Sequence, residues 1–144
     1  CWCWCWCYSH RMRPIPLLFV VLASAAANAQ STSVQNQVSE AARAVSAFGP
    51  IRAPSLQVLQ RNEALCKKHI SERLKDPDSA RFQNFQRGAS ARPELDMASG
   101  AWHAGIRYTI DVNARNGFGG YVGFKSAACV FNLPETAVLF SVFY

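Results

Sequence analysis

The sequence predicts an α+β domain in which one or two N-terminal helices pack on an antiparallel meander sheet of about four strands. Two observations support this fold class. Apolar residues recur at helical spacing over residues 34–48 and 55–75, and after residue 78 the period changes from 3.6 to 2. Helices followed by a run of strands are typical of domains whose helices cover one face of an antiparallel sheet.

Residues 12–29 have the features of a secretory signal peptide. The basic Arg13 precedes an apolar run over residues 17–27, and Ala27-Asn28-Ala29 is a small-x-small cleavage pattern. The run is shorter than the roughly 20 apolar residues that span a membrane. We expect cleavage after Ala29, a periplasmic or secreted protein, and no transmembrane segment in the mature chain. The alternating Cys-Trp repeat within residues 1–11 is interpreted as an upstream extension.

Net charge restricts the identity of the partner only weakly, and the cysteine content bears on a possible disulfide. The net charge of +6 suits an anionic membrane face or an acidic partner, and it identifies neither. Of six cysteines, only Cys66 and Cys129 lie beyond the predicted leader. A pair of cysteines in an exported chain favours a disulfide, and two buried free thiols are the alternative.

Two helices are predicted before the sheet. Residues 30–53 should form an N-terminal helix and a linker, with the helix stopped by Gly49-Pro50, and residues 54–144 the α+β domain. The second helix should begin after an N-cap at Ser55 and run to about Lys75. Its apolar stripe comprises Leu59, Cys66, Ile70 and Leu74. Asp76-Pro77 should end it, with Asp76 capping the following turn.

Strands fill the second half of the chain. Residues 80–86 form a weak first strand, and residues 88–100 have the composition of a loop. Strict alternation of apolar and polar residues makes Trp102–Val112 the clearest strand. Tyr121–Asn132 is the next, followed by a turn at Leu133-Pro134-Glu135 and a very apolar strand over residues 136–144.

The stretch NARNGFGGYVGF, residues 113–124, holds four glycines and three aromatic residues. A phosphate-binding loop would need a helix after the glycines, and strand-like sequence follows them here. The stretch is similar to the strand motif of RNA-recognition domains, but an extra glycine places Phe118 and Tyr121 on opposite faces of a strand. Nucleic acid is therefore disfavoured as a partner. A hairpin is the best interpretation, with positive φ at Asn116 and Gly117 and a bulge at Gly119-Gly120.

Four residues of this stretch are predicted to bind a partner: Arg115, Asn116, Phe118 and Tyr121. A turn needs only the Asn-Gly pair, so an aromatic residue at its tip beside an arginine has no evident role in the core. Binding surfaces are enriched in exposed aromatic and arginine side chains.

Two motifs carry a resemblance to a known family. LKDPDSARF at residues 74–82 and VNARNGFGGYVGF at residues 112–124 resemble a family of small bacterial envelope proteins that carry signal or lipoprotein leaders and have no assigned activity. The family pattern has Cys-Gly where this chain has Thr109-Ile110. The resemblance implies export, and it implies no reaction, cofactor or ligand.

Catalytic and metal-binding residues are not evident. His69, His103 and Asp111 are the acid-base candidates, and roughly 26 Å of extended strand separates the last two. No histidine or cysteine cluster has zinc spacing, so we predict no metal, no cofactor and no catalytic residues. We expect a small exported binding module for an unknown protein or envelope ligand. One alternative is a small hydrolase or enzyme inhibitor with His103 in a cleft, and another is a structural subunit that pairs through its C-terminal strand.

Overall fold

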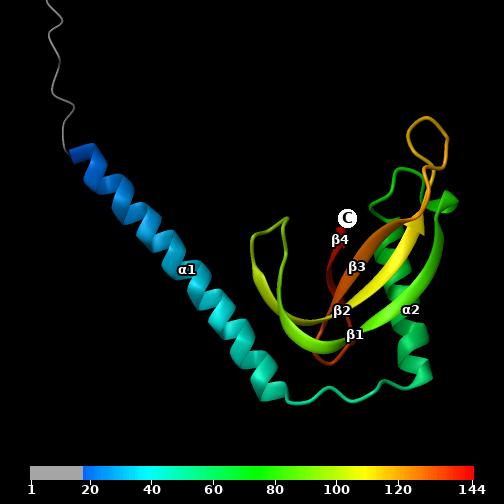
Figure 1. Cartoon of the computed structure of the whole chain (residues 1–144), viewed down its shortest axis with the longest axis horizontal. Coiled ribbons are helices and arrows are strands. Elements are labelled where there is room, and N and C mark those ends of the chain that lie inside the picture. Colours follow the sequence, from blue (N-terminus) through cyan, green and yellow to red (C-terminus); the bar gives the residue numbers. More distant parts are fainter. Residues whose placement is uncertain (1–17) are drawn as a thin grey trace, which may run out of the picture. The chain divides into compact units, whose positions relative to one another are not determined.

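The computed structural model describes the chain from Leu18 to Tyr144, with side chains from Ser31 onward. In chain order it contains helices α1 (Leu18–Phe48) and α2 (Leu56–Ser71), the 3-10 helix η1 (Pro77–Ser79), and strands β1 (Arg81–Leu95), β2 (Trp102–Asn113), β3 (Lys125–Asn132) and β4 (Val138–Phe143), as Figure 1 shows. The strands form one antiparallel sheet in the order β1-β2-β3-β4. This arrangement is the predicted α+β meander, and the fold class is confirmed.

The chain divides into two compact units, Cys1–Ser33 and Val34–Tyr144, and α1 runs from the first into the second. The predicted extension at residues 1–11 and the start of the predicted signal peptide lie outside the described residues. Among the described residues, the structure contains no helix with an apolar stretch that could span a bilayer. In the second unit Ala41 of α1 is buried, and the Gln37 side chain accepts a hydrogen bond from the Trp102 N–H at 3.4 Å.

The start of α2 agrees with the sequence prediction and its end does not. The Ser55 hydroxyl accepts a hydrogen bond from the Val58 N–H at 3.3 Å, as an N-cap does. The helix ends at Ser71 and not near Lys75, because hydrogen bonds of the tighter i to i−3 type replace the α-helical pattern from Arg73 onward. The prediction that Asp76 caps the following turn is wrong, since its side chain makes no capping hydrogen bond there.

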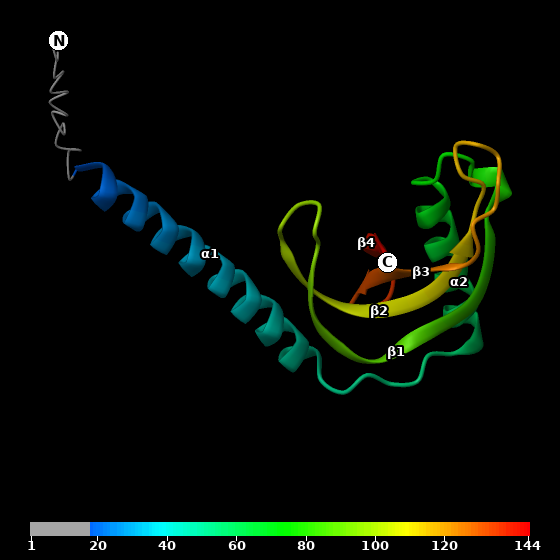
Figure 2. The same ribbon diagram turned by 45° about the horizontal axis from the view of Figure 1, so that its top comes forward.

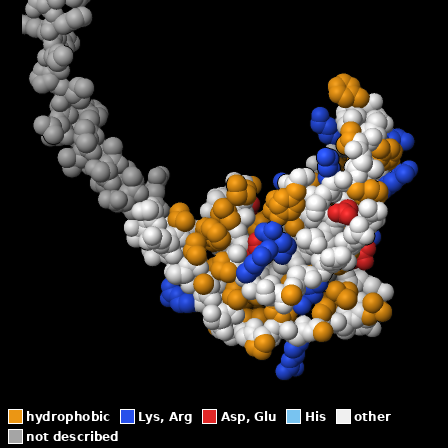
Figure 3. Space-filling view, in the orientation of Figure 1, with side chains coloured by type: hydrophobic (Ala, Val, Ile, Leu, Met, Phe, Trp, Pro, Cys, Tyr) orange, Lys and Arg blue, Asp and Glu red, His pale blue; other side chains and the backbone are white. Residues whose placement is uncertain are grey.

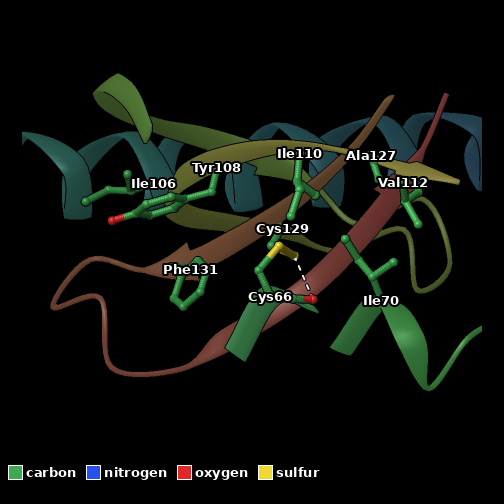
Figure 4. Packing of buried hydrophobic residues seen from close by; sticks show 9 residues of the cluster. All are labelled: Cys66, Ile70, Ile106, Tyr108, Ile110, Val112, Ala127, Cys129 and Phe131. Carbon is green, nitrogen blue, oxygen red and sulfur yellow. Dashed lines mark hydrogen bonds between the residues drawn. A yellow bond between two sulfur atoms is a disulfide. The ribbon is translucent and has the colours of Figure 1, made fainter. Parts of the chain in front are cut away.

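The hydrophobic core lies between α2 and one face of the sheet (Figure 4). Alternate residues of β2 and β3 point toward the helix, which contributes Cys66 and Ile70. The predicted disulfide is present and joins Cys66 of α2 to Cys129 of β3, with the Cα atoms 5.8 Å apart. The residues contributed by the strands are Ile106, Tyr108, Ile110, Val112, Ala127, Cys129 and Phe131.

Strand β1 is much longer than predicted. Residues 88–95, which have the composition of a loop, continue the strand and pair with β2 up to Leu95 opposite Trp102. The pairing shifts register twice, between Gln83 and Gln86 and between Arg87 and Ala91. At Gly88 a Cβ atom would lie 2.8 Å from the Arg107 carbonyl oxygen, so the glycine permits close approach of the strands. Gly88 therefore lies in a bulge of β1 and does not end the strand.

These bulges accompany a strong bend of β1 and β2 toward their connecting turn, visible in Figures 1 and 2. Ion pairs lie on the bent segment. The buried Glu94 carboxylate contacts Arg92 at 2.6 Å and also pairs with Arg107. The Arg107 guanidinium in turn donates to the Tyr144 hydroxyl at 2.7 Å. Glu94 therefore links the bend to the C-terminal residue that follows β4.

The last two strands are shorter than predicted. β3 begins at Lys125 and not at Tyr121, and β4 covers only Val138–Phe143 of the predicted residues 136–144. The turn at residues 133–135 is present, because the Glu135 N–H donates to the Asn132 carbonyl at 2.9 Å. Glu135 has a positive φ of 56°, which an L-residue adopts at a cost.

Candidate functional site

The tip of the glycine-rich loop, residues 113–124, is a three-residue turn and not the predicted two-residue one. The Asn116 N–H donates to the Gly120 carbonyl at 2.9 Å, and the Gly119 N–H donates to the Asn116 carbonyl at 3.0 Å. Positive φ occurs at Gly119 (+81°), and neither Asn116 nor Gly117 has it. The prediction of positive φ at Asn116-Gly117 is therefore wrong, while a glycine bulge at Gly119 fits the three-residue loop.

The Asn116 side chain explains the difference. Its Oδ1 atom accepts hydrogen bonds from the Phe118 N–H at 2.9 Å and from the Gly120 N–H at 3.1 Å. A side chain that holds two backbone donors of the turn stabilises the longer loop, and Gly119 then takes the left-handed conformation at little cost. Asn116 is thus a structural residue of the tip.

The base of the loop is tied to the turn that follows α2. The Ser79 hydroxyl accepts a hydrogen bond from the Arg115 N–H at 2.9 Å, and the Tyr121 hydroxyl donates to the Ser79 carbonyl at 3.0 Å. Arg115 and Tyr121 also pair with each other as an isolated β-bridge. The two sequence motifs, 74–82 and 112–124, are therefore in direct contact.

Arginine side chains lie against the Tyr121 ring. The guanidinium of Arg81 lies 4.7 Å from the ring centroid and that of Arg115 lies 5.7 Å from it. Such contacts fix the positions of both cations beside the loop. Phe118 makes no comparable contact and is 100% exposed. Of the four predicted binding residues, the structure thus brings Arg115, Asn116 and Tyr121 together and leaves Phe118 projecting.

A groove of about 420 Å³ lies beside the loop. Its walls include apolar side chains such as Leu74, Val122 and Phe143. Its four charged lining residues are all basic: Arg73, Lys75, Arg115 and Lys125. The predicted site did not include Lys75, Ser79, Arg81 or Lys125, although the first three lie within the LKDPDSARF motif. We call residues 113–124 together with Lys75, Ser79, Arg81 and Lys125 the loop site.

A second polar cluster lies at the other end of α2 and was also missed. Glu135 accepts hydrogen bonds from Arg87 at 2.9 and 2.5 Å and from the Tyr108 hydroxyl. The fully buried Asn62 donates to the Tyr108 hydroxyl at 3.0 Å, and Arg61 donates to the Glu135 carbonyl at 2.6 Å. The cluster connects α2, β1, β2 and the β3–β4 turn, and we interpret its hydrogen bonds as structural contacts that hold these elements together.

The electrostatics of this cluster agree with that interpretation. Burial opposes ionisation of Glu135, but hydrogen bonds from Arg87 and Tyr108 outweigh it and hold the pKa of the carboxyl below its ordinary value. Burial, together with the bond to Glu135, raises the pKa of Tyr108. The pair is thus held as carboxylate and neutral phenol, which are the forms that satisfy each other's hydrogen bonds.

The predicted acid-base candidates do not form a common site. The Nδ1 atom of His69 lies 3.2 Å from the Ser141 hydroxyl, which also accepts from Arg73 at 2.8 Å. His103 is on β2 with its ring 5.9 Å from that of Phe140. Among the described residues, no group of histidine, cysteine, aspartate and glutamate side chains could hold a metal ion.

Comparison with known proteins gives no family for the chain. No family model, no curated protein and no solved structure matches it.

Proposed function

We propose that the protein is an exported binding module that contacts a component of the bacterial envelope through the loop site. One observation carries the proposal: Phe118 is 100% exposed at the tip of a loop whose base is held by specific hydrogen bonds. A large apolar side chain that is fully exposed on an ordered support is typical of a binding residue, because it contributes little to folding.

Two further features support the proposal. The disulfide fits an oxidising compartment, as a periplasmic or secreted protein would meet. The resemblance to envelope proteins rests on two motifs, and Ser79, Arg115 and Tyr121 join those two motifs in space. Cleavage after Ala29 would leave the second compact unit, Val34–Tyr144, in the exported chain. The intact mass of the protein recovered from the envelope or medium tests this cleavage, and a mass that includes residues 1–29 contradicts it.

Retention by isolated bacterial envelope fractions tests the binding proposal. Phe118→Ala should reduce the amount that sediments with the envelope, and it should leave the melting temperature unchanged because Phe118 is fully exposed. Met97→Ala is the matched control, since Met97 is an apolar residue that is 75% exposed in the turn between β1 and β2. Equal retention of both variants and the wild-type protein would contradict a role for the loop.

A further inference from the structure

The glycine-rich loop combines exposed apolar side chains with an absence of acidic ones. Phe118 is 100% exposed, Val122 64%, Phe124 43% and Tyr121 38%. Residues 113–124 contain no aspartate or glutamate. Figure 1 shows the loop projecting beyond the ends of β2 and β3. Exposed apolar side chains gathered on a projecting loop mark an interaction surface.

Basic side chains surround the base of this loop. Lys75, Arg81, Arg115 and Lys125 form what we call the basic collar, and within the described part of the chain none of them is in an ion pair. Figure 3 shows Lys and Arg side chains on both sides of the projecting loop, below a hydrophobic side chain at its apex. The adjoining turn contributes two carboxylates, Asp76 and Asp78, so the collar retains an excess of positive charge.

The arrangement fits a layered partner better than a pocket on another protein. A pocket on another protein would contact the loop from one side, whereas cations lie on both sides of the apolar apex. An anionic bilayer offers this order of layers, since the apolar apex can enter the acyl boundary while the cations meet the phosphate groups. Asn116, Ser79 and Tyr121 order the loop in advance, so binding needs little further ordering.

We propose that the tip of the glycine-rich loop inserts into the surface of an anionic phospholipid bilayer, with the basic collar on the headgroups. This inference rests on the proposed function and specifies the envelope component as lipid. The apolar apex supplies insertion, and the collar supplies the preference for negative charge.

Sedimentation with lipid vesicles tests the inference with the full chain as recovered from the exporting cell. The protein should bind vesicles that contain phosphatidylglycerol more tightly than pure phosphatidylcholine vesicles, and added NaCl should weaken this preference. Lys75→Gln and Lys125→Gln should each weaken binding to the anionic vesicles about five-fold and leave binding to neutral ones unchanged. Arg52→Gln is the matched control, because Arg52 is exposed in the connector between α1 and α2.

Insertion of the tip itself has separate readouts. Phe118→Ala should weaken binding about ten-fold at any salt concentration, whereas Met97→Ala should have no effect. In a Phe118→Trp variant, brominated lipids should quench the new tryptophan and not the native Trp102. Equal vesicle binding by Phe118→Ala and wild-type protein, or an unquenched tryptophan at position 118, would overturn the inference. If vesicles do not bind but envelope retention still depends on Phe118, the partner is an envelope component other than lipid, and the inference fails while the proposed function stands.

Discussion

Removing the Cys66–Cys129 disulfide should lower the free energy of unfolding by about 4 kcal/mol through the loop that it closes. The two cysteines are separated by 63 residues, and the chain-entropy relation assigns about 4 kcal/mol to a loop of this length. Domains of this size are commonly stable by about 5–15 kcal/mol, so the bond is a large part of the total. Both cysteines are fully buried, so each alanine substitution also removes some packing.

A double-mutant cycle separates the bond from the packing. Cys66→Ala and Cys129→Ala each lose the loop constraint together with their own packing, and the double variant loses the loop constraint only once. The sum of the two single effects should therefore exceed the effect of the double variant by about 4 kcal/mol. Urea unfolding followed by far-ultraviolet circular dichroism, at low temperature and without reductant, measures all four proteins.

The denaturant slope gives an independent check. Without the bond the unfolded chain is less compact, so each variant should have a larger m-value than the wild-type protein. A coupling energy near zero would refute the reasoning. Labelling of both thiols in the folded, unreduced protein would refute the presence of the bond itself.

Three other perturbations have expected outcomes. Gly119→Ala should lower the free energy of unfolding by about 1–2 kcal/mol, because Gly119 has a φ of +81°. Gly117→Ala is the matched control and should change it little, since the new Cβ would meet only the Lys75 ammonium nitrogen at 3.6 Å. Thermal melts of the two variants test this difference. Gly105→Ala should cost about 1–3 kcal/mol or more, because a Cβ there would lie 2.6 Å from a Val130 methyl group and 2.7 Å from the Phe131 carbonyl oxygen, and a melt equal to that of wild-type protein would contradict this. The pKa of Glu135 lies below its ordinary value of 4.5, so the Glu135 carboxylate stabilises the fold above pH 4.5, and this stabilisation is lost as the pH falls below that value. Urea unfolding across this range should therefore show a smaller drop in the free energy of unfolding for Glu135→Gln than for wild-type protein.

Elements whose signals are local were predicted well. The alternation in β2 identified its bounds almost to the residue, and the Ser55 side chain supplies the predicted cap of α2. A disulfide between Cys66 and Cys129 was favoured over two free thiols because these are the two cysteines beyond the predicted leader, and the structure shows the bond. Each of these signals is carried by a few neighbouring side chains or by composition, so no knowledge of the partner elements was needed.

The extension of β1 depended on pairing that composition does not report. Glycine, serine and proline in residues 88–95 favour a loop when the segment is considered alone. In the fold, β2 supplies backbone partners as far as Leu95. The register shift between Arg87 and Ala91 accommodates Gly88 and Ser90, and Pro93 pairs with Ala104 in regular register. Hydrogen bonds to a neighbouring strand therefore overcame the local propensity.

The loop site was predicted in part. The sequence singled out Arg115, Asn116, Phe118 and Tyr121, and the predicted binding role of these residues awaits the experiments above. It assigned positive φ to the wrong residues because two-residue and three-residue turns share the Asn-Gly signal, and only the bonds made by the Asn116 side chain distinguish them.

Periodicity and a single capping side chain were enough to predict the α+β class, the alternating strand β2 and the start of α2, and the two cysteines beyond the predicted leader favoured a disulfide over free thiols. Other contacts could be found only in the folded protein: Ser79 binds Arg115 and Tyr121 across 36 and 42 residues, and Glu135 binds Tyr108 and Arg87. Such contacts need long loops of chain to close before any hydrogen bond forms. They therefore follow from the packing of α2 on the sheet, and no local pattern in the sequence encodes them.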